Sequence, residues 1–357
     1  MVTIDLVTGF LGAGKTTFIE KYARWLIGKG EKLCILENDY GAINVDAGLL
    51  QDIRGENCDV EMVIGGDGKE AHQRRFRTKL IELAMLGFNR VIVEPSGIYD
   101  VDEFFDTLMD DPLDRMARIG SVIAIVDASL KDTLSSASEY VLASEIAEAG
   151  SLVFSRIEGF SNTSEVRADK TWISRGNGSV GASNQTMKSE NTSEAGASNA
   201  KAVIGHLNRA LETVQCRRRI SEKDCIVVPW DKLTDADFEK IRNAGYHSTA
   251  YVKRQVDANG QYRSVFFFHV KLSPEKLEKR VQQIFADEAC GHVFRIKGYL
   301  PSEKTDGSWI EINAVRKHFS VKPAKEGQEV LIVIGERLDE KHIESYFRDV
   351  TDTFGAV

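Results

Sequence analysis

The chain has 357 residues, 42% of them hydrophobic, and a formal net charge of −8 at pH 7. This length favours two domains, or one large and one small, with enough apolar residues for a sizeable core. The acidic balance argues against non-specific binding of nucleic acid or of an anionic membrane, so we expect neither as a partner.

The expected lack of a targeting segment and the pattern of cysteines both favour a cytoplasmic protein. No apolar run has the length of a membrane span, and the N-terminal sequence MVTIDLVTGF lacks the basic region and cleavage site of a signal peptide. The five cysteines are scattered and never paired as CxxC, which is typical of free thiols in a reducing compartment. They are Cys34, Cys58, Cys216, Cys225 and Cys290.

The first half of the chain alternates short apolar runs with helical patterns. The runs are rich in Val, Ile and Leu and do not alternate with polar residues, as in strands buried on both faces of a parallel sheet. They lie at 4–8, 32–37, 90–94, 121–127, 151–155 and 225–229, with helices expected at 15–28, 69–86, 136–148 and 203–214. This order predicts a doubly wound α/β P-loop domain with a mostly parallel sheet over residues 1–243.

The composition changes between residues 160 and 200. This stretch is dominated by Ser, Asn, Gly, Thr and Glu. Such a segment buries too little apolar surface to offset the entropy lost on ordering, so we expect a disordered insertion.

A second pattern occupies residues 260–357. Strands are expected at 262–272, 292–300, 309–315 and 329–335, and helices at 274–289 and 338–354. The order β-α-β-β-β-α predicts a small α+β C-terminal domain, with one sheet and its helices on one face.

The clearest motif is GFLGAGKTT, residues 9–17. It fits the phosphate-binding pattern G-x-x-x-x-G-K-[ST], and an expected strand precedes it while a helical pattern follows. Gly9, Gly12, Ala13 and Gly14 would turn backbone N–H groups towards phosphate oxygens, which glycine permits without obstruction. A chance glycine-rich turn is the alternative, and the flanking strand and helix argue against it.

Three side chains of this motif have expected roles. Lys15 would place a positive charge at the β- and γ-phosphates and act in catalysis. Thr16 would supply a hydroxyl ligand to Mg²⁺, and Thr17 would reach the α-phosphate.

The run RVIVEPSG, residues 90–97, ends an expected strand in an acidic residue. Glu94 would bind on the Mg²⁺ side and orient a metal-bound or attacking water, which makes it a catalytic candidate. Ser96 and Gly97 would bring backbone N–H groups near the γ-phosphate. By itself Glu94 could simply end a strand; its combination with the phosphate motif favours the functional interpretation.

The stretch LENDYGAINVD, residues 36–46, begins at another strand end and contains Glu37, Asp39 and Asp46. A loop at the carboxyl edge of the sheet is well placed to sense the γ-phosphate. Asp39 is therefore the third catalytic candidate, as a residue that positions water. A solvated acidic turn is the alternative.

These three stretches together resemble the CobW-like GTPases, relatives of the UreG and HypB metallochaperone GTPases. The resemblance continues in the second half through FRIKGYL at Phe294–Leu300, Trp309 and LIVIGERLD at Leu331–Asp339. It implies a Mg²⁺-dependent GTPase with GTP as its substrate and slow intrinsic hydrolysis. It also implies a coupling of hydrolysis to maturation of a client protein or to delivery of a metal or cofactor.

The chain departs from this family at its metal motif. Members usually carry Cys-x-Cys-Cys after a glycine, whereas the matching stretch here is IGGDGKE. Gly65 matches the leading glycine, and Gly66, Gly68 and Lys69 stand where the thiols would be. Glycine and lysine provide no soft ligand, so no thiolate site can form there.

Other candidate metal ligands are few. Glu37 matches an acidic residue that joins metal binding in some relatives, but Ala42 stands where many have Glu. Cys290 and His292 lie two residues apart on an expected strand, and two ligands make a weak site. We therefore expect no tightly bound transition metal.

The base-recognition motif is also unusual. Small GTPases use Asn-Lys-x-Asp, whereas Ser155–Glu158 reads Ser-Arg-Ile-Glu here. Glu158 can still accept hydrogen bonds from guanine, and Arg156 can stack on the base. Pro229 and Trp230 lie where the family closes the pocket. Guanine is favoured, with adenine or no discrimination as the alternatives.

Two functions from different classes remain open. The first is a GTPase that inserts a metal or cofactor into a client. The second is a nucleotide-gated module that binds a client protein, handles no metal and has weak or no GTPase activity. The missing cysteines favour the second. The sequence does not name the client, and a homodimer stays open.

Overall fold

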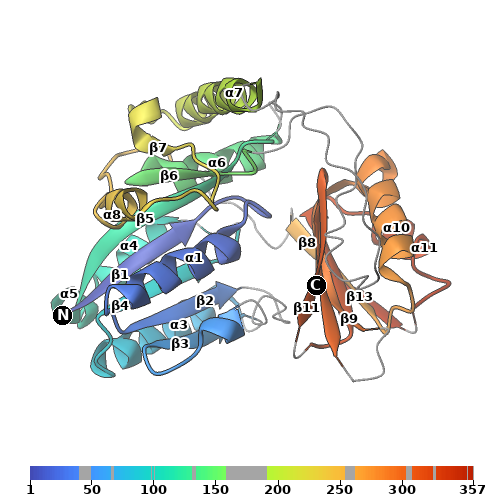
Figure 1. Cartoon of the computed structure of the whole chain (residues 1–357), viewed down its shortest axis with the longest axis horizontal. Coiled ribbons are helices and arrows are strands. Elements are labelled where there is room, and N and C mark those ends of the chain that lie inside the picture. Colours follow the sequence, from blue (N-terminus) through green and yellow to red (C-terminus); the bar gives the residue numbers. More distant parts are fainter. Residues whose placement is uncertain are drawn as a thin grey trace, which may run out of the picture.

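The computed structural model describes residues 1–39, 50–65, 68–97, 99, 101–130, 134–157, 191–253, 262–302, 308–324, 327–351 and 353–356. These residues form two β-sheets with their own helices, which lie side by side in Figure 1.

The first sheet has seven strands within the described residues, in the order β3-β2-β4-β1-β5-β6-β7, and every neighbouring pair is parallel. The strands are β1 (Val2–Thr8), β2 (Leu33–Asp39), β3 (Cys58–Ile64), β4 (Arg90–Pro95), β5 (Ala117–Asp127), β6 (Ser151–Ser155) and β7 (Cys225–Ile226). The central strands are buried on both faces, which explains their continuous apolar sequences.

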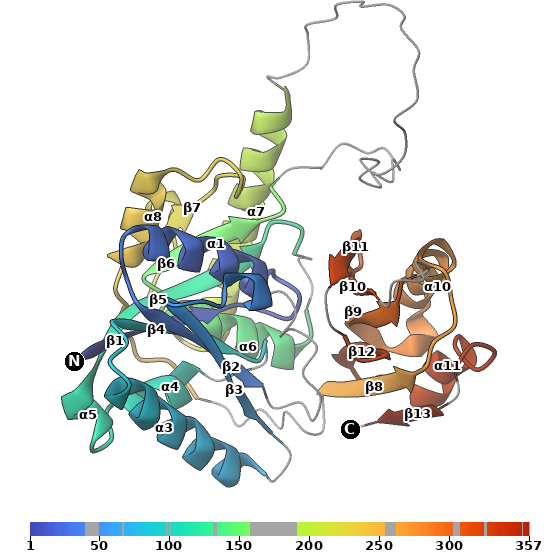
Figure 2. The same cartoon turned by 60° about the horizontal axis from the view of Figure 1, so that its bottom comes forward.

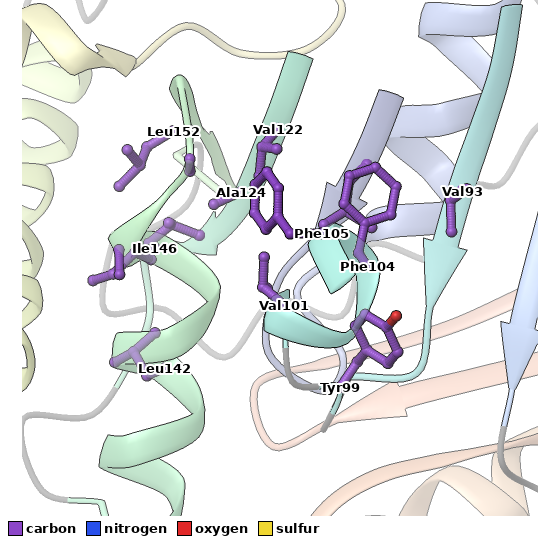
Figure 3. Close-up of a cluster of buried hydrophobic side chains, with 14 of the residues drawn as sticks. Val93, Tyr99, Val101, Phe104, Phe105, Val122, Ala124, Leu142, Ile146 and Leu152 are labelled. Carbon is purple, nitrogen blue, oxygen red and sulfur yellow. The ribbon is translucent and has the colours of Figure 1, made fainter. Parts of the chain in front are cut away.

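Helices cover both faces of this sheet. One face packs on α1 (Lys15–Gly28), the 3₁₀ turn η1 (Gln51–Ile53) and α8 (Asp235–Arg242). The other packs on α3 (Lys69–Met85), α4 (Val101–Leu108), α5 (Leu113–Met116), α6 (Ser136–Ala147) and α7 (Asn191–Thr213). Figure 3 shows Phe104 and Phe105 of α4 and Ile146 of α6 in the second of these cores. The doubly wound α/β prediction is therefore confirmed.

Some element predictions were wrong. Strand β3 was not expected from the sequence, because its half-buried edge position allows polar residues such as Asp59 and Glu61. Helices α4 and α8 were not expected either. Strand β7 is much shorter than the expected 225–229. Helix α7 begins at Asn191, inside the segment expected to be disordered, and its buried residues from Ala200 onward pack on α6. Residues 158–190 lie outside the described part.

The second sheet has six strands among the described residues, in the order β11-β10-β9-β12-β8-β13, and all pairs are antiparallel. They are β8 (Tyr262–Phe268), β9 (His292–Pro301), β10 (Trp309–Val315), β11 (His318–Ala324), β12 (Val330–Glu336) and β13 (Thr353–Ala356). The helices α10 (Pro274–Ala286) and α11 (Glu340–Ser345), with the turn η3 (Glu288–Cys290), cover one face. Figure 2 shows both helices on the side away from the first sheet.

In the second domain, the C-terminal helix and two edge strands differ from the elements expected from the sequence. The closing helix expected at 338–354 is only α11, and the chain then returns as edge strand β13 beside β8. Val350, Thr351 and Thr353 are β-branched and poor helix formers, which suits this change. Strand β11 was not predicted because most of its residues are exposed or half-exposed. The described residues include no helix with the length and apolarity needed to cross a membrane.

Candidate functional site

The loop Gly9–Gly14 joins β1 to α1 at the carboxyl edge of the first sheet. Gly9, Gly12 and Gly14 have positive φ angles of 144°, 76° and 103°. A side chain at Gly9 would place a Cβ 2.4 Å from the Ile125 carbonyl oxygen. Only glycine fits this backbone, which turns successive N–H groups in the way an anion-binding loop requires. Ala13 is buried, and its N–H donates to the Phe10 carbonyl at 3.0 Å.

Helix α1 begins at Lys15, so its free N–H groups and positive dipole end point into this loop. The Lys15 ammonium is buried and donates to the Gly9 carbonyl at 2.7 Å. The Thr16 hydroxyl donates to Glu94 Oε1 at 2.7 Å, so the two expected Mg²⁺ ligands are in contact. Thr17 follows on the first turn of the helix and is half-buried.

The neighbouring strand ends bring more polar groups to the same edge. Glu37 of β2 lies opposite Glu94 of β4 in the parallel register, and Glu37 is buried. Asp39 is the last residue of β2; its side chain lies outside the described part. The Ser96 N–H donates to the Asn38 carbonyl at 2.9 Å.

Gly97 packs directly on the phosphate loop. A Cβ there would lie 2.8 Å from the backbone N of Leu11, so a larger residue would displace the loop. Residues 96–97 therefore lie beside the loop.

Glu145 is a residue that the sequence analysis missed. It lies on α6, is fully buried, and its carboxyl group faces the Gly9 N–H and Lys15. Burial raises the pKa of Glu145 well above its usual range, while Lys15 and the Gly9 N–H oppose that shift. A sequence signal existed: Glu145 stands in the stretch VLASEIA, where every other residue is apolar or small.

Arg156 directly follows the last residue of β6. It has a left-handed backbone with φ 54°, and its guanidinium pairs with Asp127 and donates to the Gly12 carbonyl at 2.6 Å. Arg156 therefore connects the end of β6 to the phosphate loop. Ser155, just before it, is buried, and its carbonyl accepts a hydrogen bond from the Ala128 N–H. Glu158 lies outside the described residues.

Trp230 closes this edge from the other side. Its indole N–H donates to the Phe154 carbonyl at 2.8 Å, and its ring lies 3.0 Å from where a Cβ on Gly14 would be. The ring also meets Phe18 of α1 edge-on at 5.7 Å. Pro229 precedes it and is half-buried.

The second sheet lies directly against the phosphate loop. Phe10 meets Phe294 of β9 edge-on, with ring centroids 5.2 Å apart, and Leu11 packs in the same cluster. A Cβ on Gly12 would lie 2.7 Å from Cγ1 of Val315 on β10. Phe10, Leu11 and Gly12, which occupy variable positions of the phosphate motif, are therefore interdomain contacts.

A buried polar cluster continues this interface. The Ser138 hydroxyl of α6 lies 3.0 Å from the Tyr262 hydroxyl of β8 and donates to Glu336 of β12 at 3.2 Å. Burial raises the pKa of Tyr262 to about 12, so its hydroxyl stays protonated at neutral pH. Glu145 is among the charges that act on Tyr262. The buried polar side chains thus extend from Glu145, near Gly9, to Glu336 in the second sheet.

No described side chain restores the family's thiol cluster. Of the residues in the matching stretch, Gly65 and Gly68 are described, and the side chain of Lys69 is not. Ala42 and Gly66 lie outside the described residues. Cys34 and Cys58 are buried at the opposite, amino-terminal ends of β2 and β3. Cys290 is buried in the second domain, and the neighbouring His292 is exposed.

Two surface cavities of about 510 and 540 Å³ lie along α3, lined by residues such as Arg74, Lys79 and Asp106. Neither includes a residue of the phosphate loop.

Two family models match the chain in succession. The CobW/HypB/UreG nucleotide-binding domain matches residues 3–181, and the Cobalamin synthesis protein cobW C-terminal domain matches residues 263–351. The first match contains the phosphate loop and Glu94, and the second contains most of the second sheet.

Three named relatives share part of the chain. The Zinc chaperone YjiA of Escherichia coli (strain K12) is 27% identical over 136 residues, 36% of this chain and 41% of the relative. The Zinc chaperone YeiR of the same organism is 26% identical over 179 residues, 49% and 53%. The Zinc-regulated GTPase metalloprotein activator 1 of Schizosaccharomyces pombe is 24% identical over 145 residues, 37% and 33%. The chain therefore matches only 33% to 53% of the length of these relatives.

Two solved structures are similar at low identity and with low TM-scores. The Zn(II)-bound YjiA GTPase from E. coli is 16% identical over 98% of this chain and 99% of that chain, with a TM-score of 0.32. A LAO/AO transport system kinase is 18% identical over 67% and 60%, with a TM-score of 0.36. The nucleotide-binding family model spans half of the chain and the C-terminal model follows it, so the chain belongs to the CobW/HypB/UreG family of nucleotide-binding proteins.

Proposed function

We propose that this chain binds GTP with Mg²⁺ at the phosphate loop and the first residues of α1, Gly9–Thr17, and hydrolyses it. The observation that carries this proposal is the 2.7 Å contact between the Thr16 hydroxyl and Glu94, next to the buried Lys15 ammonium at the start of α1. Cation, hydroxyl and carboxylate thus converge where a helix N-terminus favours an anion.

Each group has a distinct role towards the triphosphate. The loop N–H groups and Lys15 bind phosphate oxygens, with Lys15 released from the Gly9 carbonyl to do so. Thr16 and Glu94 offer only oxygen donors, which fit a hard cation such as Mg²⁺. That ion would neutralise phosphate charge when bound. The Ser96 and Gly97 backbone lies beside the loop, on the side of Glu94.

Water is oriented by a carboxylate in this proposal. Glu94 is the first candidate because it already contacts Thr16, and Asp39 at the end of the neighbouring strand is the second. Without a partner that supplies an additional cation, hydrolysis is expected to be slow.

Guanine recognition is assigned to the segment after β6. Glu158 would accept hydrogen bonds from the base, Ser155 and Arg156 would line the pocket, and Pro229 and Trp230 would close it. The Arg156 contact with Asp127 fixes the start of this segment against the phosphate loop, which supports a pocket there.

The second sheet would transmit the nucleotide state. Phe10 and Gly12 belong to the loop that binds phosphate, yet they also contact Phe294 and Val315. A change of loop conformation on GTP binding therefore alters the interface, and by linkage the interface alters GTP affinity. This arrangement supports a switch in which GTP controls how the C-terminal domain meets a client protein.

The proposal has two versions, which differ in whether the protein delivers a metal to its client. The named relatives are zinc chaperones and a GTPase metalloprotein activator, which supports metal delivery to a client. The stretch IGGDGKE, without the thiols of the family motif, supports a nucleotide-gated protein-binding module instead.

The test is GTP hydrolysis measured as phosphate release, with Mg²⁺ and with a chelator. We expect turnover that requires Mg²⁺ and is lost in Glu94→Gln, which keeps the size of the side chain but not its charge. A matched control is Glu20→Gln on the same helix as Thr16, where Glu20 pairs with the exposed Arg24. Absence of turnover together with absence of GTP binding in the unmodified chain would refute the proposal.

A further inference from the structure

The second domain contains a cluster of metal-ligand side chains far from the phosphate loop. Asp287, Cys290 and His342 each offer one ligand atom, and these three atoms lie within 4.8 Å of one another. The sequence analysis paired Cys290 with His292, but the structure places His342 beside it instead.

The backbone holds these three residues together. Asp287 ends α10 and caps η3, Cys290 ends η3, and His342 lies in α11. The Asp339 N–H donates to the Cys290 carbonyl at 3.3 Å, which fixes the start of α11 against η3. Gly291 permits this approach, because a Cβ there would lie 2.3 Å from the Arg337 carbonyl.

The ligand set is exposed on one side and buried on the other. The Cys290 side chain is fully buried, whereas the side chains of Asp287 and His342 are 28% and 40% exposed. A metal would therefore sit at the surface with sulfur beneath it and a solvent-facing position left open.

Outer contacts already orient the carboxylate. The Tyr346 hydroxyl donates to Asp287 Oδ2 at 2.6 Å, and the Ala289 N–H donates to Oδ1 at 3.0 Å. Both carboxylate oxygens of Asp287 therefore accept a hydrogen bond from outside the ligand set. Such outer contacts are typical around metal ligands.

We infer that Asp287, Cys290 and His342 form a three-ligand site for Zn²⁺, with the fourth position open to water or to a ligand from another molecule. Thiolate, imidazole and carboxylate together select a borderline metal such as Zn²⁺ or Co²⁺ over Mg²⁺. Three protein ligands with one open position suit exchange of the metal more than a closed structural role. This inference departs from the sequence-based expectation of no tightly bound transition metal.

Metal binding requires the ligand atoms to move, since they now lie within 4.8 Å of one another without an ion between them. His342 Nε2 lies 2.7 Å from Asp287 Oδ2, whereas ligand atoms around a tetrahedral Zn²⁺ are about 3.3–3.8 Å apart. The half-exposed His342 can move outward by this amount. The ion would take the place of the hydrogen between these two atoms.

The thiol must lose its proton for the metal to bind. Burial, together with the charges of Asp287 and Asp339, raises the pKa of Cys290 to about 11. Zn²⁺ binding is therefore expected to release this proton into solution, which a weakly buffered titration can detect.

The experiment uses the full chain, freed of metal and kept reduced with a phosphine. Zn²⁺ is titrated in competition with a chromophoric chelator, and Co²⁺ is added separately to record its absorption spectrum. We expect one Zn²⁺ per chain, and a Co²⁺ complex with thiolate charge-transfer absorption and the intense visible bands of a tetrahedral site.

Variants assign the site. Cys290→Ser should abolish the thiolate absorption, and Cys290→Ser and His342→Asn should each weaken Zn²⁺ binding by about 100-fold or more, beyond the usual loss from an outer contact. The matched controls are Cys225→Ser, a buried cysteine of the first domain, and His269→Asn, an exposed histidine paired with Glu329. Both should bind Zn²⁺ like the unmodified chain.

Two results would overturn the inference: no stoichiometric Zn²⁺ binding, or binding that survives His342→Asn unchanged. The second variant guards against misfolding of Cys290→Ser, because His342 lies at the surface. Lys15→Ala should bind Zn²⁺ normally, so failure of the GTPase proposal leaves this test intact.

Discussion

Replacement of Lys15 by alanine removes the one lysine of the phosphate loop. Its ammonium is buried and donates to the Gly9 carbonyl at 2.7 Å, so little reorganisation separates it from a bound phosphate. A hydrogen bond to a charged group contributes about 1.5–3 kcal/mol. Removing one such hydrogen bond to a phosphate oxygen should therefore weaken GTP binding by about 10- to 150-fold.

The effect on folding should be smaller than the effect on binding. The variant loses the bond to Gly9, but it also no longer buries an ammonium group. Glu145 loses a nearby positive charge, which should move the pKa of its carboxyl group further upward. Adding Glu145→Gln to the variant should therefore recover part of any lost stability.

Calorimetry with GTP and phosphate release measure the two effects, and circular dichroism checks that the variant is folded. Lys21→Ala is the control, since Lys21 is a half-exposed residue of the same helix. We expect hydrolysis to disappear in Lys15→Ala and to persist in Lys21→Ala. A folded Lys15→Ala protein with unchanged GTP affinity and turnover would refute the assignment of the loop.

Three further predictions concern other parts of the protein. Thr16→Ala should weaken Mg²⁺-dependent GTP binding and Thr16→Ser should preserve it, as measured by calorimetry with and without a chelator; equal loss in both variants would contradict a hydroxyl ligand. If Glu158 reads guanine, GTP should bind more tightly than ATP by about 1–3 kcal/mol, and Glu158→Ala should erase the difference; equal affinities in the unmodified chain would disprove this role. Burial raises the pKa of Glu145 in the folded chain, so its contribution to stability is complete below the unfolded pKa near 4.5 and falls as the pH rises towards the folded value. Glu145→Gln should therefore gain stability over the unmodified chain between pH 4.5 and neutral pH in urea unfolding, whereas a constant difference would show that Glu145 does not titrate this way.

The sequence by itself predicted the features that depend on neighbouring residues. The phosphate motif is contiguous, and its glycines, lysine and threonine need only the local strand-loop-helix to come together. The central strands of the first sheet were predicted because burial on both faces makes their sequences continuously apolar. Both observations rest on residues a few positions apart.

Edge strands were harder to predict for a physical reason. Most residues of β3 and β11 are exposed or only partly buried, so polar residues are tolerated and the apolar run disappears. At the edges of their sheets, β3 pairs with β2 and β11 pairs with β10. Hydrogen bonding to a neighbouring strand therefore stabilises these strands although their own sequences favour a strand only weakly.

Only the tertiary structure decided which distant side chains meet. Glu145 reaches the underside of Gly9 because α6 packs beneath the loop, and Arg156 turns to Asp127 and Gly12. The cluster of Asp287, Cys290 and His342 joins a turn to a helix roughly fifty residues later, through the packing of α11 on η3. Sequence periodicity indicates which face of a helix or strand is buried, but it does not indicate which other elements pack against that face. The chemistry of these clusters depends on which elements pack together.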